Sequence, residues 1–400
     1  MKIIKTHANQ YIYYHMQTNI SITGMGSISP LGADRANIWR QYLSDKPLLV
    51  GQQVGEELLP VGRLQEESHA LVREIRQENA RYRSVDPTVL YALYASRQAL
   101  QEAGWEQGKD FGVNIGSSRG ATTLFEEYHQ NFLEQGKCAP LASPTTSLGN
   151  IASWVMQDAK GQGVAISHSI TCSTALHALL NGIAWLHADM AEGFLVGGSE
   201  APLTPFTLSQ MKALKIYGSL SDSYPCQPLL LEKLKNTMVL GEGSAVFAIE
   251  KGVRPNALAI VKGIGYATEV ITHPVAISAQ AEALRLSMQQ ALQGVAPAEV
   301  DVVIPHATGT IKGDEAEYHA LREVFGQNLP RLTSNKWKIG HTFAASGALA
   351  IEMAVLMLQN QQFLPLPYLK KEAEAPLRNI LINATGFGGN AVSVLIGLPY

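Results

Sequence analysis

Ser167-His-Ser-Ile-Thr-Cys-Ser-Thr-Ala-Leu-His-Ala-Leu-Leu180 joins two different sequence patterns. The apolar run Gly163-Val-Ala-Ile166 before it predicts a buried strand, and the Ala/Leu-rich stretch from Ser173 to Leu186 has the spacing of a buried helix. Cys172 falls at the junction, where free N–H groups and the helix macrodipole favour a thiolate. The pattern predicts a nucleophile at a strand-to-helix elbow. A buried structural cysteine is the alternative interpretation.

The bulk composition excludes several classes of protein. The chain has 400 residues with 31 basic and 34 acidic side chains, so nothing favours a polyanion-binding surface and we expect no nucleic-acid partner. Three unevenly spaced cysteines form neither a disulfide framework nor a CxxC metal site, which predicts a reducing cytoplasm and neither a metal nor a cofactor. No apolar run is expected to reach the roughly 18 residues of a membrane helix. Residues 1–18 are polar and Tyr-rich and predict an N-terminal extension without a secretory signal.

Strand and helix patterns alternate along the chain and then repeat, which predicts an α/β fold with buried sheets covered by helices. The first half has a strand and Gly loop at 19–32, a helix at 86–103 capped by Asp86 with Pro87 next, a strand at 111–118, the Cys172 elbow, and a Gly turn and strand at 239–250. Matching segments follow at 257–265, 278–293, 300–309, 338–350 and 386–396. We therefore expect two halves, 19–252 and 253–400. Residues 45–85 are expected to lie on the surface with little β structure, and 203–236 to be irregular.

Chemistry-bearing residues gather at the strand and helix ends of the second half, where α/β folds build their sites. His306 follows an apolar strand pattern, and His341 lies between Gly340 and a small-residue helix, five residues after Lys336. Gly386-Phe-Gly-Gly389 leaves little side chain, so backbone N–H groups can approach a ligand there. A single loop histidine most often only forms local hydrogen bonds. Two histidines and a cysteine at corresponding junctions form a more specific constellation.

The chain resembles an elongating β-ketoacyl-acyl-carrier-protein synthase, a condensing enzyme of the thiolase superfamily. The resemblance runs from about Ile20 to Ile396. It rests on ordered motifs, which are Thr-Gly-Met-Gly-x-x-Ser-Pro-Leu-Gly at 23–32, Thr-Cys-Ser-Thr at 171–174, Val-Gly-Gly-Ser-Glu at 196–200, Leu-Gly-Glu-Gly at 240–243, His-Ala-Thr-Gly-Thr at 306–310, Gly-Asp-Glu-Ala-Glu at 313–317, Lys336 with Gly-His341, and Gly-Phe-Gly-Gly at 386–389. The family implies a thiolase-like, duplicated α-β-α-β-α layered fold, which agrees with the repeat.

The resemblance also implies the roles of the site residues. Cys172, His306 and His341 match the family's catalytic triad: the thiol takes an acyl group from a carrier-protein thioester, and the two imidazoles stabilise the enolate formed from malonyl-carrier protein. The backbone N–H groups of Cys172 and Phe387 would form the oxyanion hole, and Phe387 matches the family's gate. Lys336 and Glu317 match its charged support. The partners implied are acyl- and malonyl-loaded acyl carrier proteins, and a homodimer or a heterodimer with a related ketosynthase-like subunit.

Several positions depart from the family pattern. The usual Glu on the helix after His341 is Ala350, and Glu352 lies about 200° further round that helix, which leaves the partner of Lys336 open. Two positions that belong to the acyl pocket by the resemblance carry Thr385 in place of a Phe and Arg119 in place of an apolar residue. Arg119 would need a partner and would disfavour a long saturated chain. The stretch 229–237 keeps only Glu232 and Lys235 of the family's charged motif. These departures predict a specialised enzyme, and ketosynthases for aryl-polyene or flexirubin-like pigments resemble the pattern.

Other functions fit the sequence less well. A non-decarboxylative thiolase needs a second cysteine near its C-terminus, and this chain has none after Cys226. An initiating, CoA-primed ketosynthase would carry Asn in place of His341. A chain-length-setting subunit lacks the nucleophile, so Cys172 argues against that role, although the protein could be the active half of such a pair. A structural protein would not need this combination of residues.

Overall fold

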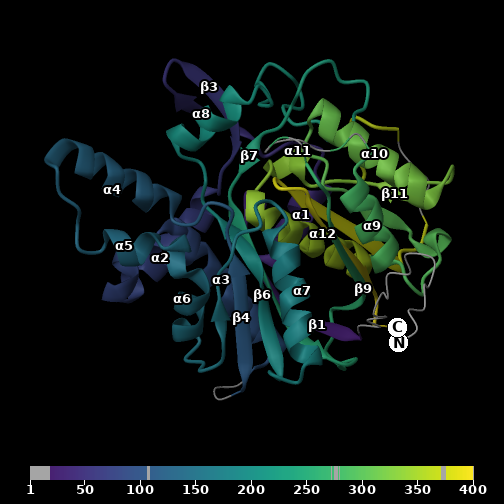
Figure 1. Cartoon of the computed structure of the whole chain (residues 1–400), viewed down its shortest axis with the longest axis horizontal. Helices are drawn as coiled ribbons and strands as arrows, with labels where there is room; N and C mark the ends of the chain where they lie inside the picture. Colours follow the sequence, from purple (N-terminus) through teal and green to yellow (C-terminus); the bar gives the residue numbers. More distant parts are fainter. Residues whose placement is uncertain are drawn as a thin grey trace, which may run out of the picture.

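The fold is built from two five-stranded sheets. The computed structural model describes residues 19–105, 109–271, 273, 278, 280–370 and 375–399, so the predicted extension over 1–18 lies outside the described residues. The first sheet has the order β1-β8-β6-β4-β5 and the second the order β11-β10-β12-β13-β9 (Figure 1). Their strands are β1 (Ile20–Ile28), β4 (Phe111–Gly116), β5 (Ala165–Ile166), β6 (Gly193–Glu200), β8 (Gly243–Lys251), β9 (Ala259–Thr268), β10 (Val302–Ile304), β11 (Arg331–Leu332), β12 (Asn379–Gly386) and β13 (Asn390–Gly397).

The two sheets have the same topology, which confirms the predicted internal duplication. In the first sheet β1–β8 and β8–β6 are antiparallel, while β6–β4 and β4–β5 are parallel. In the second sheet β9–β13 and β13–β12 are antiparallel, while β12–β10 and β10–β11 are parallel. The predicted strand pairs, β1 with β9, β4 with β10 and β8 with β13, therefore occupy the same places in the two sheets. The boundary between 252 and 253 itself stays a prediction.

Helices cover both faces of each sheet, so the fold has five layers, two of strands and three of helices. The helices and turns are α1 (Arg35–Leu43), α2 (Glu66–Glu78), η1 (Ala80–Ser84), α3 (Pro87–Ala103), α4 (Thr122–Gln135), α5 (Ala142–Thr146), η2 (Leu148–Asn150), α6 (Ile151–Asp158), α7 (Thr174–His187), α8 (Pro205–Ala213), α9 (Glu282–Ala291), η3 (Pro297–Glu299), α10 (Ile311–Phe325), α11 (Lys336–Ile339), η4 (Phe343–Ala345) and α12 (Ser346–Asn360). The α3 and α6 helices pack on one sheet, and α9 packs on the other with α10 beside it. Between the sheets, α7 and α12 fill a continuous apolar core. This confirms the α-β-α-β-α prediction.

The α3 helix shows how the sequence sets an element and its packing. Asp86 caps it by accepting a hydrogen bond from Thr88 N at 2.9 Å, and Pro87 occupies the first turn, as predicted. Gly24 and Gly26 of β1 lie directly against this helix, because a Cβ on Gly26 would come within 2.1 Å of the Ala95 carbonyl oxygen. The glycines of the opening motif therefore bring strand and helix together.

Three predictions about local structure are wrong. The predicted strand at 163–166 is reduced to the two-residue β5, which is only half-buried because it lies at the edge of its sheet. The surface segment 45–85 contains a hairpin, β2 (Val50–Val54) and β3 (Glu57–Gly62), which pairs with β7 (Leu240–Gly241). The irregular segment 203–236 contains α8, which Thr204 caps and Pro205 begins. A short, partly buried element gives little periodic signal.

The longest apolar segment lies in the core. Phe343–Asn360 is long and apolar enough to cross a membrane, contrary to the prediction, but 89% of it is buried inside the protein. It is the one such segment in the part of the chain that the structure describes. Its burial between the two sheets explains why it is apolar on every side.

Candidate active site

Cys172 lies in a tight elbow that leads into α7. Thr171 has a φ of 47°, a left-handed conformation that costs a β-branched residue about 1–3 kcal/mol. The Thr174 hydroxyl stabilises the turn, because it donates a hydrogen bond to Thr171 O at 2.6 Å and accepts one from Ile170 N at 2.8 Å. Cys172 then comes two residues before the helix and is 8% exposed. The predicted elbow is therefore present.

The surroundings of Cys172 favour the neutral thiol. Its side chain packs in an apolar cluster that includes Leu208, Met211 and Phe343. Burial in this cluster, and secondarily the nearby carboxyl group of Glu200, raise the pKa of Cys172 to about 12. Burial and Glu200 thus shift the pKa of this thiol in the direction opposite to the sequence-based expectation of a thiolate.

Glu200, at the end of β6, ties the two halves of the site together. It is fully buried, and its carboxylate accepts hydrogen bonds from Ser117 Oγ (2.7 Å), Ser118 N (2.8 Å), Arg119 N (3.2 Å) and Ala344 N (3.2 Å). Burial outweighs these bonds and raises its pKa to about 7. The sequence placed Glu200 in a motif but gave it no role.

The two predicted histidines lie next to each other. The ring centroids of His306 and His341 are 5.3 Å apart, with the rings nearly perpendicular. His341 also stacks edge-on against Phe343, which belongs to the cluster around Cys172. Its backbone N–H donates to Val239 O at 2.6 Å, and its Nδ1 is buried without a hydrogen-bond partner among the described residues. Burial lowers the pKa of His341 to about 3 and that of His306 well below its ordinary value, so both imidazoles are neutral at pH 7.

Glu317 holds the loop that presents His306. Its carboxylate accepts from His306 N at 2.9 Å, Ala307 N at 2.8 Å and Asn383 Nδ2 at 3.1 Å. Glu317 is 2% exposed. Two of these three bonds come from backbone N–H groups of the His306 loop and none involves the imidazole ring, so Glu317 orients the loop.

Lys336 is the charged group common to the triad. It is 2% exposed, and its charge lowers the pKa of Cys172, His306 and His341. Burial lowers the pKa of Lys336 itself, and Glu317 is the largest opposing charge that acts on it. Glu317 therefore supplies the electrostatic partner that the sequence left open.

The turn between β12 and β13 passes over the Cys172 elbow. Its Gly386 lies so close that a Cβ there would be 2.0 Å from Thr171 Oγ1 and 3.3 Å from Cys172 N. The Thr171 hydroxyl also approaches Phe387 O at 3.5 Å. The side chain of Phe387 is 42% exposed. The backbone of this turn thus lies beside the backbone of Cys172.

Arg119 and Thr385 each donate one side-chain hydrogen bond. Arg119 is half-buried, and its Nη2 donates to Gln210 Oε1 on α8 at 2.7 Å, while its Nε is buried without a partner in the described part of the chain. The α8 helix also supplies Leu208 to the cluster around Cys172. Thr385 donates to Asn390 O at 2.9 Å across the base of the turn.

A buried ion pair that the sequence missed supports the His306 loop. Lys233 Nζ lies 2.8 Å from Asp314 Oδ2, with the two side chains 2% and 0% exposed. Asp314 also accepts from Gly309 N at 3.1 Å and Leu229 N at 2.9 Å. The predicted analogues, Glu232 and Lys235, are not the residues in this pair. The motif around Asp314 was the available signal, but its partner lies 81 residues away in the chain.

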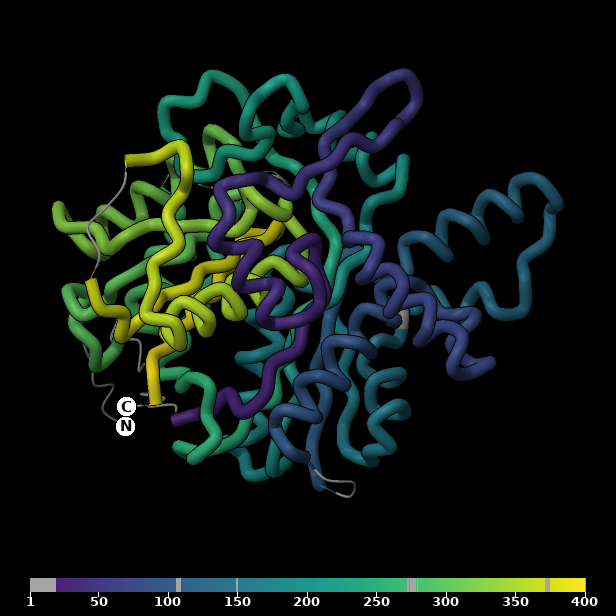
Figure 2. The backbone as a smooth tube through the Cα atoms, turned by 180° about the vertical axis from the view of Figure 1, so that it is seen from behind, coloured from purple at the N-terminus to yellow at the C-terminus, as the bar shows by residue number. Residues whose placement is uncertain are grey.

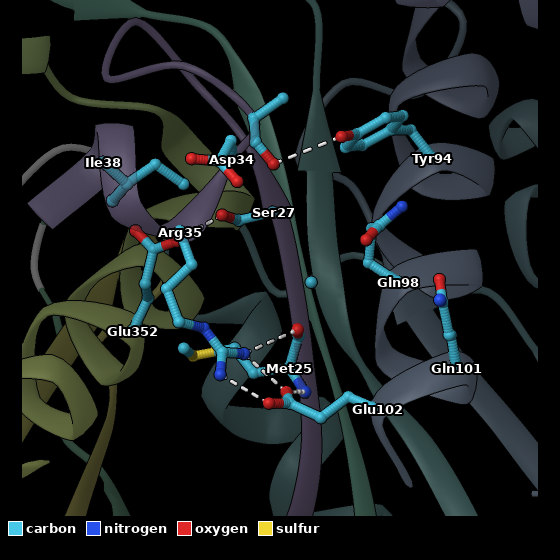
Figure 3. Close-up of a pocket in the computed structure, with 12 residues that line it drawn as sticks. Met25, Ser27, Asp34, Arg35, Ile38, Tyr94, Gln98, Gln101, Glu102 and Glu352 are labelled. Atoms are coloured by element: carbon cyan, nitrogen blue, oxygen red, sulfur yellow. Dashed lines mark hydrogen bonds and ion pairs between the residues drawn. The ribbon is translucent and has the colours of Figure 1, made fainter. Parts of the chain in front are cut away.

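Glu352 points away from the triad, as its position on α12 predicts. Its carboxylate accepts hydrogen bonds from the Ser27 hydroxyl and, at 3.4 Å, from Tyr42 OH. It lines a cavity of about 440 Å³ between β1, α1, α3 and α12, across which Arg35 pairs with Glu102 (Figure 3). Burial raises the pKa of Glu352 to about 7.

No group of three or more His, Cys, Asp or Glu side chains that could hold a metal ion occurs among the described residues. The three cysteines are free. The arrangement offers a thiol, two neutral imidazoles and backbone donors, which together suit acyl transfer.

Comparison with known proteins identifies the class. The beta-ketoacyl synthase N-terminal domain matches residues 17–253, and the beta-ketoacyl synthase C-terminal domain matches residues 258–370. The chain therefore belongs to the beta-ketoacyl synthase family of condensing enzymes.

Its relatives cover nearly the whole chain. A 3-oxoacyl-(acyl-carrier-protein) synthase 2 of Coxiella burnetii is 26% identical over 92% of this chain and 96% of its own length. The enzyme of the same name from Vibrio cholerae is 26% identical over 94% and 98%. The fold is shared with a ketosynthase in complex with its chain length factor from Xenorhabdus doucetiae, with a TM-score of 0.78 and 19% identity over 97% of this chain and 100% of that one. The fold is also shared with a chain from a complex of a type II PKS acyl-carrier protein with its ketosynthase. The TM-score is 0.83 and the identity 20%, over 96% of this chain and 100% of that one.

Proposed function

We propose that the protein is a β-ketoacyl-acyl-carrier-protein synthase that joins an acyl group on Cys172 to a two-carbon unit from malonyl-carrier protein. What supports this is that His341 packs on Phe343, a member of the apolar cluster around the elbow thiol Cys172, and that His306 packs on His341. Relatives named 3-oxoacyl-(acyl-carrier-protein) synthase 2 along the full chain support the same reaction.

The first half-reaction loads Cys172. Its sulfur attacks the thioester carbonyl of an acyl-carrier protein, the bond to the carrier sulfur breaks, and the thiol proton passes to that sulfur. Since the resting thiol is neutral and both imidazoles are poor bases, the proton leaves sulfur as the new C–S bond forms and ends on the carrier sulfur. The backbone N–H groups of Cys172 and Phe387 stabilise the tetrahedral oxyanion, each at about 3–4 kcal/mol in comparable sites.

The second half-reaction uses His306 and His341. Malonyl-carrier protein loses CO2, and the electron pair forms an enolate whose oxygen accepts hydrogen bonds from both imidazoles. Their low pKa values keep them neutral, so they donate hydrogen bonds without first becoming cations. The carbanion attacks the acyl carbonyl on Cys172, the C–S bond breaks, the released thiolate takes a proton from water, and the β-ketoacyl product leaves on the carrier protein. Lys336 and Glu317 order this part of the site.

Arg119 and Thr385 shape the acyl pocket. Arg119 keeps a buried Nε without a partner, beside a helix that supplies apolar groups to the Cys172 cluster. A fully saturated chain would leave that donor unsatisfied. This supports a fatty-acid-like, polyketide or polyene substrate of a specialised pathway, with aryl-polyene or flexirubin-like pigments as the candidate products.

The partners are acyl carrier proteins and a second ketosynthase subunit. The arm formed by α4 and α5 projects from the body of the protein (Figure 1), and it exposes large apolar side chains, Phe125, Phe132, Leu133 and Leu141. Such an apolar arm favours an oligomer, either a homodimer or a heterodimer with a related subunit. The free cysteines fit a reducing compartment such as the cytoplasm.

Intact-mass analysis with a panel of acyl-carrier proteins tests the function. We expect a mass increase that maps to Cys172 in the wild type and is absent from Cys172→Ala. Addition of malonyl-carrier protein should then discharge the acyl group and yield a β-ketoacyl product. A folded wild type that takes no acyl group from any donor, alone or with its partner subunit, would contradict the proposal.

A further inference from the structure

Lys338 is a second buried lysine of the short α11 helix, and it faces away from the triad. Its ammonium group donates to the carbonyl oxygens of Gln41 at 2.8 Å and Lys46 at 3.1 Å, and also to that of Ser44. These carbonyls belong to the last turn of α1 and the residues just after it. A cation suits this place because the C-terminal carbonyls of a helix lack partners and carry partial negative charge.

The surroundings of Lys338 disfavour its charged form unless the ammonium group is hydrogen-bonded. It is 1% exposed, and its Nζ lies 4.5 Å from the ring centroid of Trp337. Burial lowers the pKa of Lys338 to about 8, while Asp45, in the loop after α1, acts in the opposite direction. The carbonyl oxygens of Gln41, Ser44 and Lys46 are thus the main groups that satisfy this ammonium group.

The clamp holds a segment that carries catalytic groups on both sides. Lys336 begins α11, and His341 follows its end after Gly340, which has a φ of 76°. Leu48 N donates to Lys338 O at 2.8 Å, and His341 N donates to Val239 O at 2.6 Å. The segment is therefore held by the chain after α1 on one side and by the residues next to β7 on the other. Figure 2 shows the N-terminal β1 and α1 segment lying across the C-terminal part of the molecule.

We propose that Lys338 is a positioning residue for the condensing reaction, and that its three-carbonyl clamp fixes the Lys336–His341 segment for decarboxylation. This rests on the proposed function. A neutral amine has two hydrogens for three carbonyl oxygens, so loss of the proton loosens the clamp. The resting Cys172 elbow does not depend on this segment, because Ile170, Thr171 and Thr174 close it locally.

Two variants separate charge from size. Lys338→Met keeps most of the side-chain length without a charge, and Lys338→Arg stays charged across the useful pH range. Lys262→Met is the matched control, since Lys262 is a half-buried lysine whose pKa burial also lowers, and its Nζ donates to Asn379 Oδ1 at 2.8 Å. For Lys338→Met we expect kcat for malonyl-carrier-protein decarboxylation to fall about tenfold or more, with KM and the rate of Cys172 acylation within twofold of wild type.

The pH profile is the readout that a purely structural role would not move. Wild-type decarboxylation should fall as pH rises through about 8, and Lys338→Arg should lack that fall. Lys336 also titrates near the site, but it is unchanged in Lys338→Arg, so the difference between the two profiles belongs to Lys338. Identical profiles in the two proteins would overturn the inference, as would a Lys338→Met variant with wild-type decarboxylation.

Hydrogen exchange keeps the inference testable without any activity. In Lys338→Met we expect faster amide exchange over 336–342 than in wild type or in Lys262→Met, with unchanged exchange over 170–174. Equal exchange over 336–342 in all three proteins would overturn the clamp even if the enzyme is active. A wild type that never decarboxylates malonyl-carrier protein would instead contradict the proposed function, and the exchange result would still decide the clamp.

Discussion

The chain enters a buried central helix twice with nearly the same backbone, once in each half. Thr171 has a φ of 47° and Phe343 a φ of 44°, and each lies three residues before its helix, α7 or α12. The residue that follows is Cys172 in the first elbow and Ala344 in the second. Both elbows approach β6, since a Cβ on Gly198 would meet Ala344 O at 2.6 Å and the Ala175 side chain at 3.1 Å.

The difference between the elbows shows how a duplicated fold divides one reaction. The first elbow presents a thiol, whereas the second has a methyl group at the same position and places His341 just before it. Glu200 connects them, because it accepts a hydrogen bond from Ala344 N and its charge raises the pKa of Cys172. The repeated backbone supplies geometry, and the side chains that differ supply chemistry.

Cys172→Ala should have the largest effect, because it makes the two elbows chemically alike. We expect acylation to disappear and condensation to fall by about 10³-fold or more, as for other nucleophile deletions. Decarboxylation of malonyl-carrier protein should persist, since His306 and His341 remain. Intact mass and CO2 release measure the two steps. Cys226→Ala is the matched control, as the removal of a second buried thiol, and an acyl adduct that survives in Cys172→Ala would contradict the assignment.

His341→Ala tests the other elbow. Loss of one donor to the developing enolate should lower decarboxylation by about 10²–10³-fold, while Cys172 still takes an acyl group. Because the pKa of His341 is held at about 3, the wild-type rate should show no loss from its protonation between pH 5 and 8. His319→Ala, the removal of an exposed histidine on α10, is the control. A decarboxylation rate that falls in step with protonation of an imidazole near pH 6 would contradict the neutral state.

The sequence predicted those parts of the site whose signals are local. The elbow at Cys172, the cap at Asp86 and the order of segments in both halves each follow from neighbouring residues, and the structure confirms them. His306, His341 and Gly386-Phe-Gly-Gly389 were singled out by their places at strand and helix ends, and the family resemblance supplied their roles. Their roles, with those of Lys336, Glu317, Phe387, Arg119 and Thr385, stay proposals.

What the sequence could not predict depends on contacts between distant residues. Lys233 pairs with Asp314 across 81 positions, and Lys338 reaches carbonyls nearly 300 residues away. The neutral state of Cys172 depends on how deeply the elbow is buried and on where Glu200 lies, which only the fold sets. The β2–β3 hairpin was missed because strand pairing, and not periodicity, defines it.

Glu200→Gln should have a smaller effect, on the pKa of Cys172, because Glu200 is the residue that connects the two elbows. Glutamine keeps the size of the side chain but removes the negative charge near Cys172, so the pKa of the thiol should fall and alkylation by iodoacetamide should speed up severalfold to about tenfold, since one pKa unit is a factor of ten. The pKa of Glu200 is about 7, so wild type and variant should differ above pH 7, where the carboxyl is ionised, and converge below pH 6, where it is protonated.

Cys226 provides the internal control for this experiment. Burial also raises its pKa to about 12, and its main charged neighbours are Asp314, Lys336 and Lys233, without Glu200. Its alkylation should therefore be the same in both proteins. Equal alkylation of Cys172 in wild type and variant at pH 9 would show that burial alone sets the state of the thiol.

Gly347→Ala should have the smallest effect, on the spacing of the two helices that follow the elbows. A Cβ on Gly347 of α12 would lie 2.8 Å from Leu176 Cγ of α7, so the helices must separate or a side chain must shift. Overpacking of this kind costs about 1–3 kcal/mol in the free energy of unfolding, measured by denaturant titration. Condensation should fall more than acylation, because only condensation needs both elbows.

Leu176→Ala alone leaves a cavity, but combined with Gly347→Ala it makes room for the new methyl group, so the double variant should be more stable than the sum of the single changes predicts. Strict additivity would mean that the two helices do not set the spacing of the elbows.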